Sequence, residues 1–154
     1  MTVRDRNLAH LNSLGFCVAD SLPTIRSGQP TVLRPVHEIA MRFAALAAVF
    51  LWAGAQEDDV PSAELQHYIE ANDLRGALSD DDLAILALDR NQAIDQHSRT
   101  IGWRLENIWS LAWILGFELP PALSGMIDDQ TIRRMITEFL KYPSNSVADV
   151  VSRC

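Results

Sequence analysis

The stretch TIGWRLENIWSLAWILGF, residues 100–117, decides the fold class of this chain of 154 residues. It holds three of the four tryptophans, and its only charged residues are Arg104 and Glu106. An apolar, tryptophan-rich composition of this kind predicts a helix that packs in the protein core. At about 100° per residue the two charged side chains point about 160° apart, so neither neutralises the other. Each of them needs a partner elsewhere if it is buried.

Arg104 projects among apolar residues of its own helix, where an unpaired guanidinium would be costly. We therefore expect a carboxylate from the opposing helix, such as Glu38, to pair with it. Glu106 shares its side of the helix with Ser110. Two interpretations of these charges stay open. They are either buried tethers that fix the register of the helices, which we favour, or parts of a polar pocket that also contains His37.

The three tryptophans of this stretch are Trp103, Trp109 and Trp113. Aromatic side chains on an apolar helix lie in a protein core far more often than they form a wall for a ligand. We therefore predict that all three are buried.

Helical periodicity extends over most of the chain. Residues 35–54 form a long apolar stretch that opens at a proline, and within it Glu38 and Arg42 have the spacing of an i, i+4 ion pair. We expect this helix and a second long helix over residues 91–115 to be the central packed pair. Shorter helices are predicted over residues 4–14, 61–73, 79–90 and 128–142.

Residues 16–30 contain too many proline and glycine breakers for a helix, so we predict an extended segment that lies across the bundle. Gly15 and Gly116 are placed to cap the ends of the helices that precede them. The fold class is therefore all-α: a single-domain helical bundle of about six helices with a long N-terminal extended segment. Its parts are an N-terminal helix and extended arm at 1–33, a helical core at 34–141 and a C-terminal tail at 142–154.

The composition excludes several classes of function. A net charge of −7, with no local cluster of Lys and Arg, repels a phosphate backbone, so we expect no nucleic-acid partner. The longest uncharged apolar run, residues 43–55, is shorter than the roughly 20 residues that span a bilayer, so we expect a buried helix and no membrane partner. The sequence shows no secretory signal, and Cys17 and Cys154 have no CxxC spacing. These features predict a cytoplasmic protein with reduced thiols.

No motif in the sequence predicts catalysis or a bound metal. The four histidines include no i, i+4 pair, and Glu64 with His67 forms a single Glu-x-x-His unit, whereas a di-iron bundle needs two. The runs of aspartate lack the alternating ligand order of a calcium loop. Cys17 has no neighbouring base, and no glycine loop of the phosphate-binding kind is present. We predict no catalytic residue, no metal site and no cofactor, and favour a protein that is not an enzyme.

Three segments, LRPVHEIAMRFAALAAVFLW at 33–52, ALSDDDLAIL at 77–86 and WRLENIWSLAWILG at 103–116, together resemble an uncharacterised, mainly bacterial family catalogued as domain of unknown function 4272. The resemblance covers most of the chain, and its most specific part is a W-R-x-E-x-x-W-x-x-x-W-x-x-G helix. It implies a helical domain with no assigned activity. We interpret the motif residues as structural: Trp103, Arg104, Glu106, Trp109, Trp113 and Gly116.

Two acidic clusters are the candidates for contact with a partner: Glu57, Asp58 and Asp59 in one turn, and Asp80, Asp81 and Asp82 where a helix begins. Both clusters should be solvated, and acidic surfaces attract and orient basic proteins. We predict a non-enzymatic protein-binding domain, in its sharpest form a cytoplasmic immunity protein that neutralises a basic toxin. Two alternatives stay open. One is a small-ligand-binding or enzymatic domain with a polar pocket around Arg104 and Glu106, and the other is a homodimeric structural subunit.

Overall fold

The computed structural model describes residues 3–13, 15, 34–117, 127–138 and 146–154. These residues form eight α-helices, one short 3₁₀ helix and no strand, so the predicted all-α class is confirmed. Residues 1–33 and 34–154 each make most of their contacts within their own range, and the two units are described in turn.

The N-terminal unit contains helix α1, Val3–Ser13. Leu8 and Leu11 are half-buried, and the other described side chains of α1 are exposed. Gly15 follows the helix with a φ of 84° and donates its N–H to the carbonyl oxygen of Asn12 at 3.0 Å, so the predicted glycine cap is confirmed. The extended segment that we predicted over residues 16–30 lies outside the described residues.

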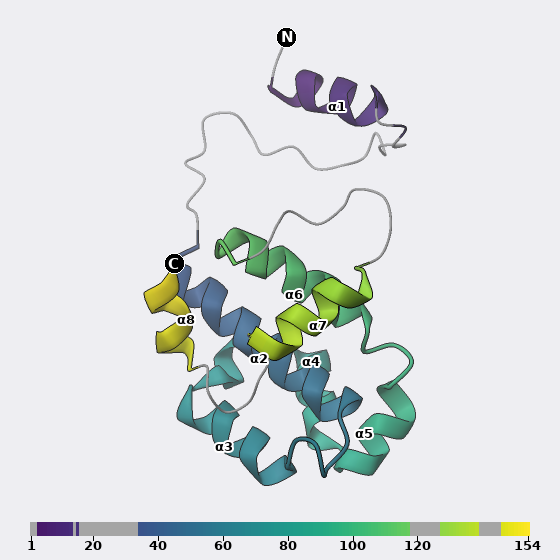
Figure 1. The fold of residues 1–154 in the computed structure, drawn as a ribbon, viewed down its shortest axis with the longest axis vertical. Helices are drawn as coiled ribbons and strands as arrows, with labels where there is room; N and C mark the ends of the chain where they lie inside the picture. The colour runs from purple at the N-terminus through teal and green to yellow at the C-terminus, as the bar shows by residue number, and fades with distance from the viewer. Residues whose placement is uncertain (1–2, 14, 16–33, 118–126, 139–145) are drawn as a thin grey trace. The chain divides into compact units, whose positions relative to one another are not determined.

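Helix α2 is the centre of the second unit (Figure 1). It contacts α3, the 3₁₀ helix η1, α4, α5, α6 and α8. The bounds of these elements are α2 Val36–Gly54, α3 Ser62–Ala71, η1 Leu74–Ala77, α4 Asp80–Ala87, α5 Arg90–His97, α6 Trp103–Ile114, α7 Asp129–Glu138 and α8 Val147–Arg153.

The central position of α2 follows from its sequence. Small alanines let neighbouring helices approach closely, while Phe43, Leu46 and Trp52 fill the space between them. Eleven of its nineteen residues are buried. With a mean hydropathy of 1.5, α2 is long and apolar enough to cross a membrane, but the core helix of a soluble protein meets the same criteria. Its burial agrees with the buried helix that we predicted.

The single long helix predicted over residues 91–115 is in fact two helices, α5 and α6. Both contact α2, so the central packing of this region against α2 is confirmed. The chain between them makes tighter turns, because the N–H groups of Thr100 and Trp103 bond to carbonyl oxygens three residues back instead of four, at 2.9 and 3.1 Å. Ile101 is 5% exposed and anchors the turn in the core. Gly102 follows it, and glycine has a low propensity for the interior of a helix.

Local hydrogen bonds cap the C-terminal end of α6 and the N-terminal end of α8. After α6, Gly116 has a φ of 81°, and the N–H groups of Gly116 and Phe117 bond back to Trp113 and Ala112, as the predicted glycine stop requires. Residues 147–153, which we predicted as part of a tail, form α8 instead. Ser146 and Asp149 make a capping box at its start, and its valines pack into the core.

Candidate functional site

Asp82 completes the N-terminal cap of α4. Its Oδ2 atom accepts hydrogen bonds from the backbone N–H of Ser79 at 3.0 Å and from the Ser79 hydroxyl at 2.7 Å. The N–H of Asp82 donates in return to the Ser79 hydroxyl at 3.3 Å. This reciprocal pairing is a capping box, which satisfies N–H groups that the start of a helix leaves free. The cap that we predicted at Ser79 is confirmed, and Asp82 is its other half.

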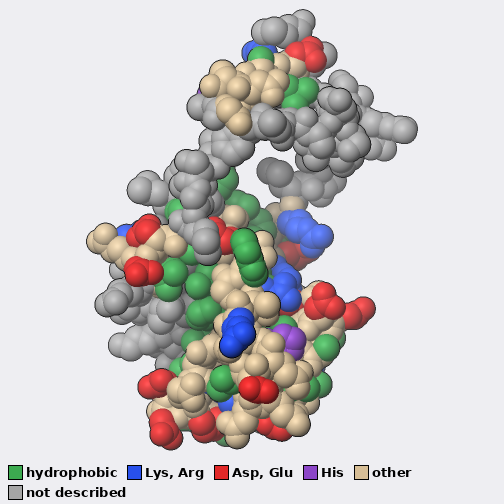
Figure 2. Space-filling model, turned by 90° about the vertical axis from the view of Figure 1, so that its right-hand side faces the viewer, with side chains coloured by type: hydrophobic (Ala, Val, Ile, Leu, Met, Phe, Trp, Pro, Cys, Tyr) green, Lys and Arg blue, Asp and Glu red, His purple; other side chains and the backbone are tan. Residues whose placement is uncertain are grey.

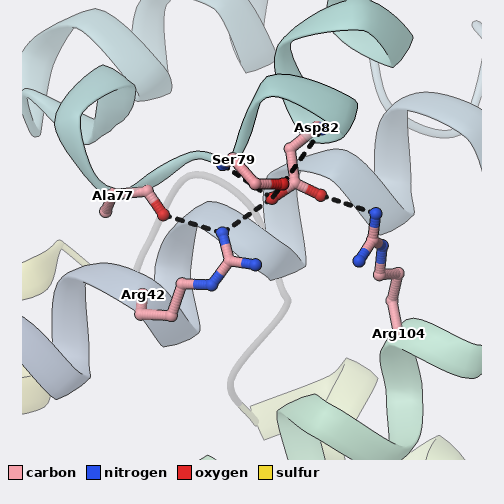
Figure 3. Close-up of polar contacts among 5 residues, drawn as sticks. All are labelled: Arg42, Ala77, Ser79, Asp82 and Arg104. Carbon is pink, nitrogen blue, oxygen red and sulfur yellow. Dashed lines mark hydrogen bonds and ion pairs between the residues drawn. The ribbon is translucent and has the colours of Figure 1, made fainter.

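Two arginines from other helices contact the same carboxylate (Figure 3). Nη1 of Arg42 on α2 donates to Oδ2 of Asp82 and to the carbonyl oxygen of Ala77, both at 2.7 Å. Nη2 of Arg104 on α6 lies 2.8 Å from Oδ1 of Asp82. The Arg104 N–H groups are not aligned with Oδ1, which accepts no hydrogen bond from the described residues, so this contact is an ion pair held by proximity. We call Arg42, Asp82 and Arg104 the Asp82 cluster.

The surroundings of Asp82 keep its carboxylate ionised. Its side chain has no solvent exposure, whereas those of Arg42 and Arg104 are 33% and 24% exposed. Burial by itself raises the pKa of Asp82, but hydrogen bonds from Ser79 and the hydrogen bond and charge of Arg42 outweigh it, and the pKa lies below its ordinary value. The Asp82 cluster therefore joins α2, α4 and α6 through one buried anion.

Glu38 is not the partner of Arg104, so that prediction is wrong. Glu38 is 52% exposed on the first turn of α2 and lies 3.6 Å from Arg34. The i, i+4 pair that we predicted between Glu38 and Arg42 is also not formed, because the Arg42 guanidinium binds Asp82. A buried carboxylate attracts a guanidinium more strongly than an exposed one, since water screens the exposed pair.

The structure separates the six acidic residues that we predicted as partner contacts. Asp82 is fully buried, so the expectation that it is solvated is wrong. Its Oδ2 atom accepts hydrogen bonds from Ser79 and Arg42, and its Oδ1 atom forms the ion pair with Arg104. The other five are exposed: Glu57, Asp58, Asp59, Asp80 and Asp81. Glu57 also accepts hydrogen bonds from the hydroxyl and, at 2.9 Å, the N–H of Ser62, which lower the pKa of Glu57 and tie its turn to the start of α3.

Arg104 and Glu106 have separate partners among the described residues. Oε1 of Glu106 accepts the backbone N–H of Ile127 at 2.7 Å, which fastens the segment before α7 to α6. Ser110 uses its hydroxyl to bond the backbone carbonyl oxygen of Glu106 at 2.9 Å. His37 lines a different hollow, beside α8. The hollow that Arg104 lines includes none of Glu106, Ser110 and His37, and the alternative of a polar pocket around Arg104 and Glu106 stays a prediction.

Of the three tryptophans predicted in the core, only Trp109 is buried, at 6% exposure. Trp103 is 67% exposed and Trp113 is 49% exposed, so the prediction is wrong for both. The helical period explains the difference. Trp109 shares a face with the buried residues Leu105 and Ala112, whereas Trp103 lies about 160° from Leu105 and Trp113 lies at the edge of the buried face.

Acidic side chains are concentrated in residues 55–98, all of which the structure describes. This segment holds eleven Asp and Glu against two Arg, a formal charge of −9, while the rest of the chain carries +2. All of these acids except Asp82 are exposed, whereas Arg90 is buried, which leaves Arg75 as the only exposed arginine of the segment. Figure 2 shows acidic side chains gathered around the lower part of the second unit. We call the surface of residues 55–98 the acidic end.

Several hollows open on the surface of the second unit. One of about 400 Å³ lies between α3 and α4 within the acidic end and has Ile69, Leu78, Leu83 and Leu86 in its wall. Another of about 510 Å³ lies between α4, α5 and α6, beside Arg104. Across the described ranges, no three His, Cys, Asp or Glu side chains come together as metal ligands.

Comparison with known families places the chain. A family model described as Domain of unknown function (DUF4272) matches residues 4–153. The chain belongs to this family. No curated protein and no solved structure matches it.

In this DUF4272 chain, sequence reasoning missed the role of Asp82. Two signals pointed to it: Ser79 and Asp82 have the S-x-x-D spacing of a capping box, and Arg42 and Arg104 each lie in an apolar helix that offers no buried acid. Both signals are consistent with an acid at a helix start that pairs with an arginine, but neither indicates that one acid serves both arginines. The sequence alone does not give the side of α4 on which Asp82 lies.

Arg90 is a buried cation that the sequence did not reveal. Nη2 of Arg90 donates to the carbonyl oxygens of Leu51 at 2.9 Å and Ala55 at 2.8 Å, and the guanidinium carbon lies 5.4 Å from the centre of the Trp52 ring. These carbonyl oxygens are at the C-terminal end of α2, where a cation is favoured. Burial lowers the pKa of Arg90, and Glu57 at 3.9 Å partly offsets that effect.

Proposed function

We propose that this protein binds a basic protein through its acidic end, and that in its sharpest form it is an immunity protein that neutralises a basic toxin. The observation that carries the proposal is the charge of residues 55–98, where ten exposed acids face solvent with Arg75 as the only exposed arginine. An uncompensated acidic surface speeds association with a basic partner and disfavours acidic competitors.

The acidic end also has a hollow of mixed polarity between α3 and α4. The half-buried side chains of Leu78, Leu83 and Leu86 line it together with the polar side chains of Gln66, Glu70 and Arg75. Protein interfaces commonly combine an apolar centre with a polar rim, and the centre contributes most of the affinity. We propose that an apolar side chain of the partner enters this hollow while basic residues around it contact the acids.

Hydrogen bonds fix the backbone that carries the exposed acids of the acidic end, and a fixed surface favours tight binding. The turn that carries Asp58 and Asp59 is closed by hydrogen bonds from the N–H groups of Asp59 and Val60 to the carbonyl oxygen of Gln56, at 3.2 and 3.1 Å. Asp80 and Asp81 lie in the first turn of α4, which the capping box fixes. A preformed surface loses less conformational entropy when it binds. The chain's sequence features also support a cytoplasmic location, where the protein would encounter a toxin made by the same cell.

The experiment for the immunity form uses the product of the gene next to this one. That product is expressed under control in a host cell, alone or together with this chain, and cell survival is measured. We expect the neighbouring product to be toxic and this chain to restore growth. A harmless neighbouring product, or toxicity that the chain does not relieve, would overturn the immunity form.

A matched pair of variants tests whether the acidic end carries the effect. Asp58→Lys with Asp59→Lys reverses two exposed charges of the acidic end, and Glu38→Lys with Asp129→Lys makes the same change of charge at exposed positions outside it. We expect the first pair to lose protection and the second to keep it. Equal protection by both pairs would exclude the acidic end as the contact surface.

A further inference from the structure

The Asp82 cluster carries more positive than negative charge. Asp82 provides one negative charge for the two guanidinium groups of Arg42 and Arg104. Arg42 also bonds the carbonyl oxygen of Ala77, whereas Arg104 makes no polar contact with the described residues other than its ion pair to Asp82. An arginine has five N–H donors, so most of the N–H groups of Arg104 have no partner among the described residues. A second anion beside Arg104 would balance the charge and use these donors.

The hollow of about 510 Å³ gives such an anion room to bind. Arg104 lines it together with the polar side chains of Gln96, His97, Thr100 and Asn107. The rest of its wall is apolar and is formed by Ala84, Ile85, Leu88 and Ile101. A few converging polar groups on an apolar wall are typical of a site for a small molecule. One acid, Asp81, also lines the hollow and is exposed.

Trp103 adds an aromatic surface at the same hollow. Its side chain is 67% exposed, the largest exposure among the described bulky apolar residues, and it also lines the hollow. An exposed indole has apolar faces that a flat ring can cover, and stacked or edge-on aromatic contacts are favourable beyond the burial of apolar surface. Trp113 is exposed on the same helix but does not line this hollow.

We propose that the hollow between α4, α5 and α6 binds a small molecule that carries an anionic group on or beside a flat ring. The anion, a phosphate or a carboxylate, contacts Arg104, and the ring lies against Trp103. This chemistry is shared by nucleoside monophosphates and aromatic carboxylates. The site is separate from the hollow between α3 and α4 and does not depend on the function proposed above.

The test follows the four tryptophan indole N–H signals of the full chain by two-dimensional NMR, with the Trp103 signal assigned from Trp103→Phe. The probes are adenosine 5′-monophosphate and benzoate, with neutral adenosine and benzyl alcohol as their uncharged counterparts. We expect one anionic probe to shift the Trp103 signal in a saturable way while its neutral counterpart does not. The probe that succeeds identifies the phosphate or the carboxylate source. No saturable shift with either anion, or equal shifts with the neutral probes, would overturn the proposal.

Variants separate binding from folding. Asn107→Asp places a negative charge in the hollow one helical turn from Arg104 and replaces no residue of the Asp82 cluster, and Asn91→Asp makes the same change at an exposed position outside the hollow. We expect Asn107→Asp to weaken binding of the anionic probe about tenfold or more, because like charges repel, and Asn91→Asp to leave it unchanged. Trp103→Ala should also weaken binding, whereas Trp113→Ala should not. Unchanged binding in Asn107→Asp would contradict the site even if the anion binds elsewhere.

Discussion

Arg104 lies 2.8 Å from one oxygen of the Asp82 carboxylate, and the other oxygen of that carboxylate accepts a hydrogen bond from Arg42 at 2.7 Å. Through this relationship α6 is joined to α4 and α2 by a fully buried charge. Asp82 also completes the cap of α4, so one side chain supports the start of a helix and the packing of two others.

Asp82→Asn should strongly destabilise the protein. The amide keeps the shape of the carboxylate but leaves two arginines without a counter-charge, and breaking a buried ion pair of this kind costs about 3–5 kcal/mol. Urea unfolding followed by circular dichroism measures the change. Asp81→Asn, at an exposed neighbouring position, is the control and should cost at most about 1 kcal/mol through the helix dipole. Similar losses in both variants would mean that the ion pairs contribute little.

Arg104→Ala should destabilise the protein less than Asp82→Asn, by about 1–3 kcal/mol. After this change Asp82 still has Arg42 and the cap of Ser79, so its charge keeps a partner. A double-mutant cycle between the two positions should show that the effects are not additive, because both changes remove the same ion pair. Additive losses would indicate that the 2.8 Å contact contributes nothing to stability.

The stability should depend on pH through Asp82. Its pKa is lowered in the folded protein relative to an ordinary value of about 3.9, so its contribution is complete above about pH 5 and is lost as the pH falls through the folded pKa. The free-energy difference between wild type and Asp82→Asn should therefore shrink on acidification. Unfolding curves at several pH values between about 3 and 7 measure it. A difference that stays constant or grows at low pH would contradict the lowered pKa.

Glu106→Ala should loosen the segment before α7. Glu106 accepts the N–H of Ile127 at 2.7 Å, and loss of a buried hydrogen-bond partner costs about 1–3 kcal/mol. Amide hydrogen exchange should become faster at Ile127 and in the first turn of α7. Glu106→Gln keeps an acceptor oxygen and should preserve most of the protection. Unchanged exchange at Ile127 in the alanine variant would show that this contact does not hold the segment.

Local signals in the sequence were enough to predict most helices. Proline at helix starts, a serine cap at Ser79 and glycine stops at Gly15 and Gly116 act over a few residues, and the structure contains each of them. Helical periodicity also identified the central helix α2, because a helix that is apolar on nearly every side has to be surrounded.

The candidate site could not be predicted in the same way, because it depends on contacts between distant segments. Arg42, Asp82 and Arg104 are far apart in the sequence, and pairing Arg104 with Glu38 was equally consistent with the pattern. The exposure of Trp103 depends on which face of α6 meets α2. The break between α5 and α6 likewise depends on Ile101, which anchors the turn only once the core is formed.

The central claim, that the acidic end is a binding surface, is tested most directly by crosslinking in the cells that make this protein. A photo-reactive amino acid replaces Asp59 in the acidic end or, as the matched control, Gln130 on α7, which is also exposed. Crosslinked proteins are identified by mass spectrometry. We predict that position 59 captures one basic protein, that raising the salt concentration weakens its binding, and that position 130 does not capture it. Capture of a partner at position 130 and not at position 59 would contradict the claim. Capture at position 59 of an acidic protein whose binding does not depend on the salt concentration would also contradict it.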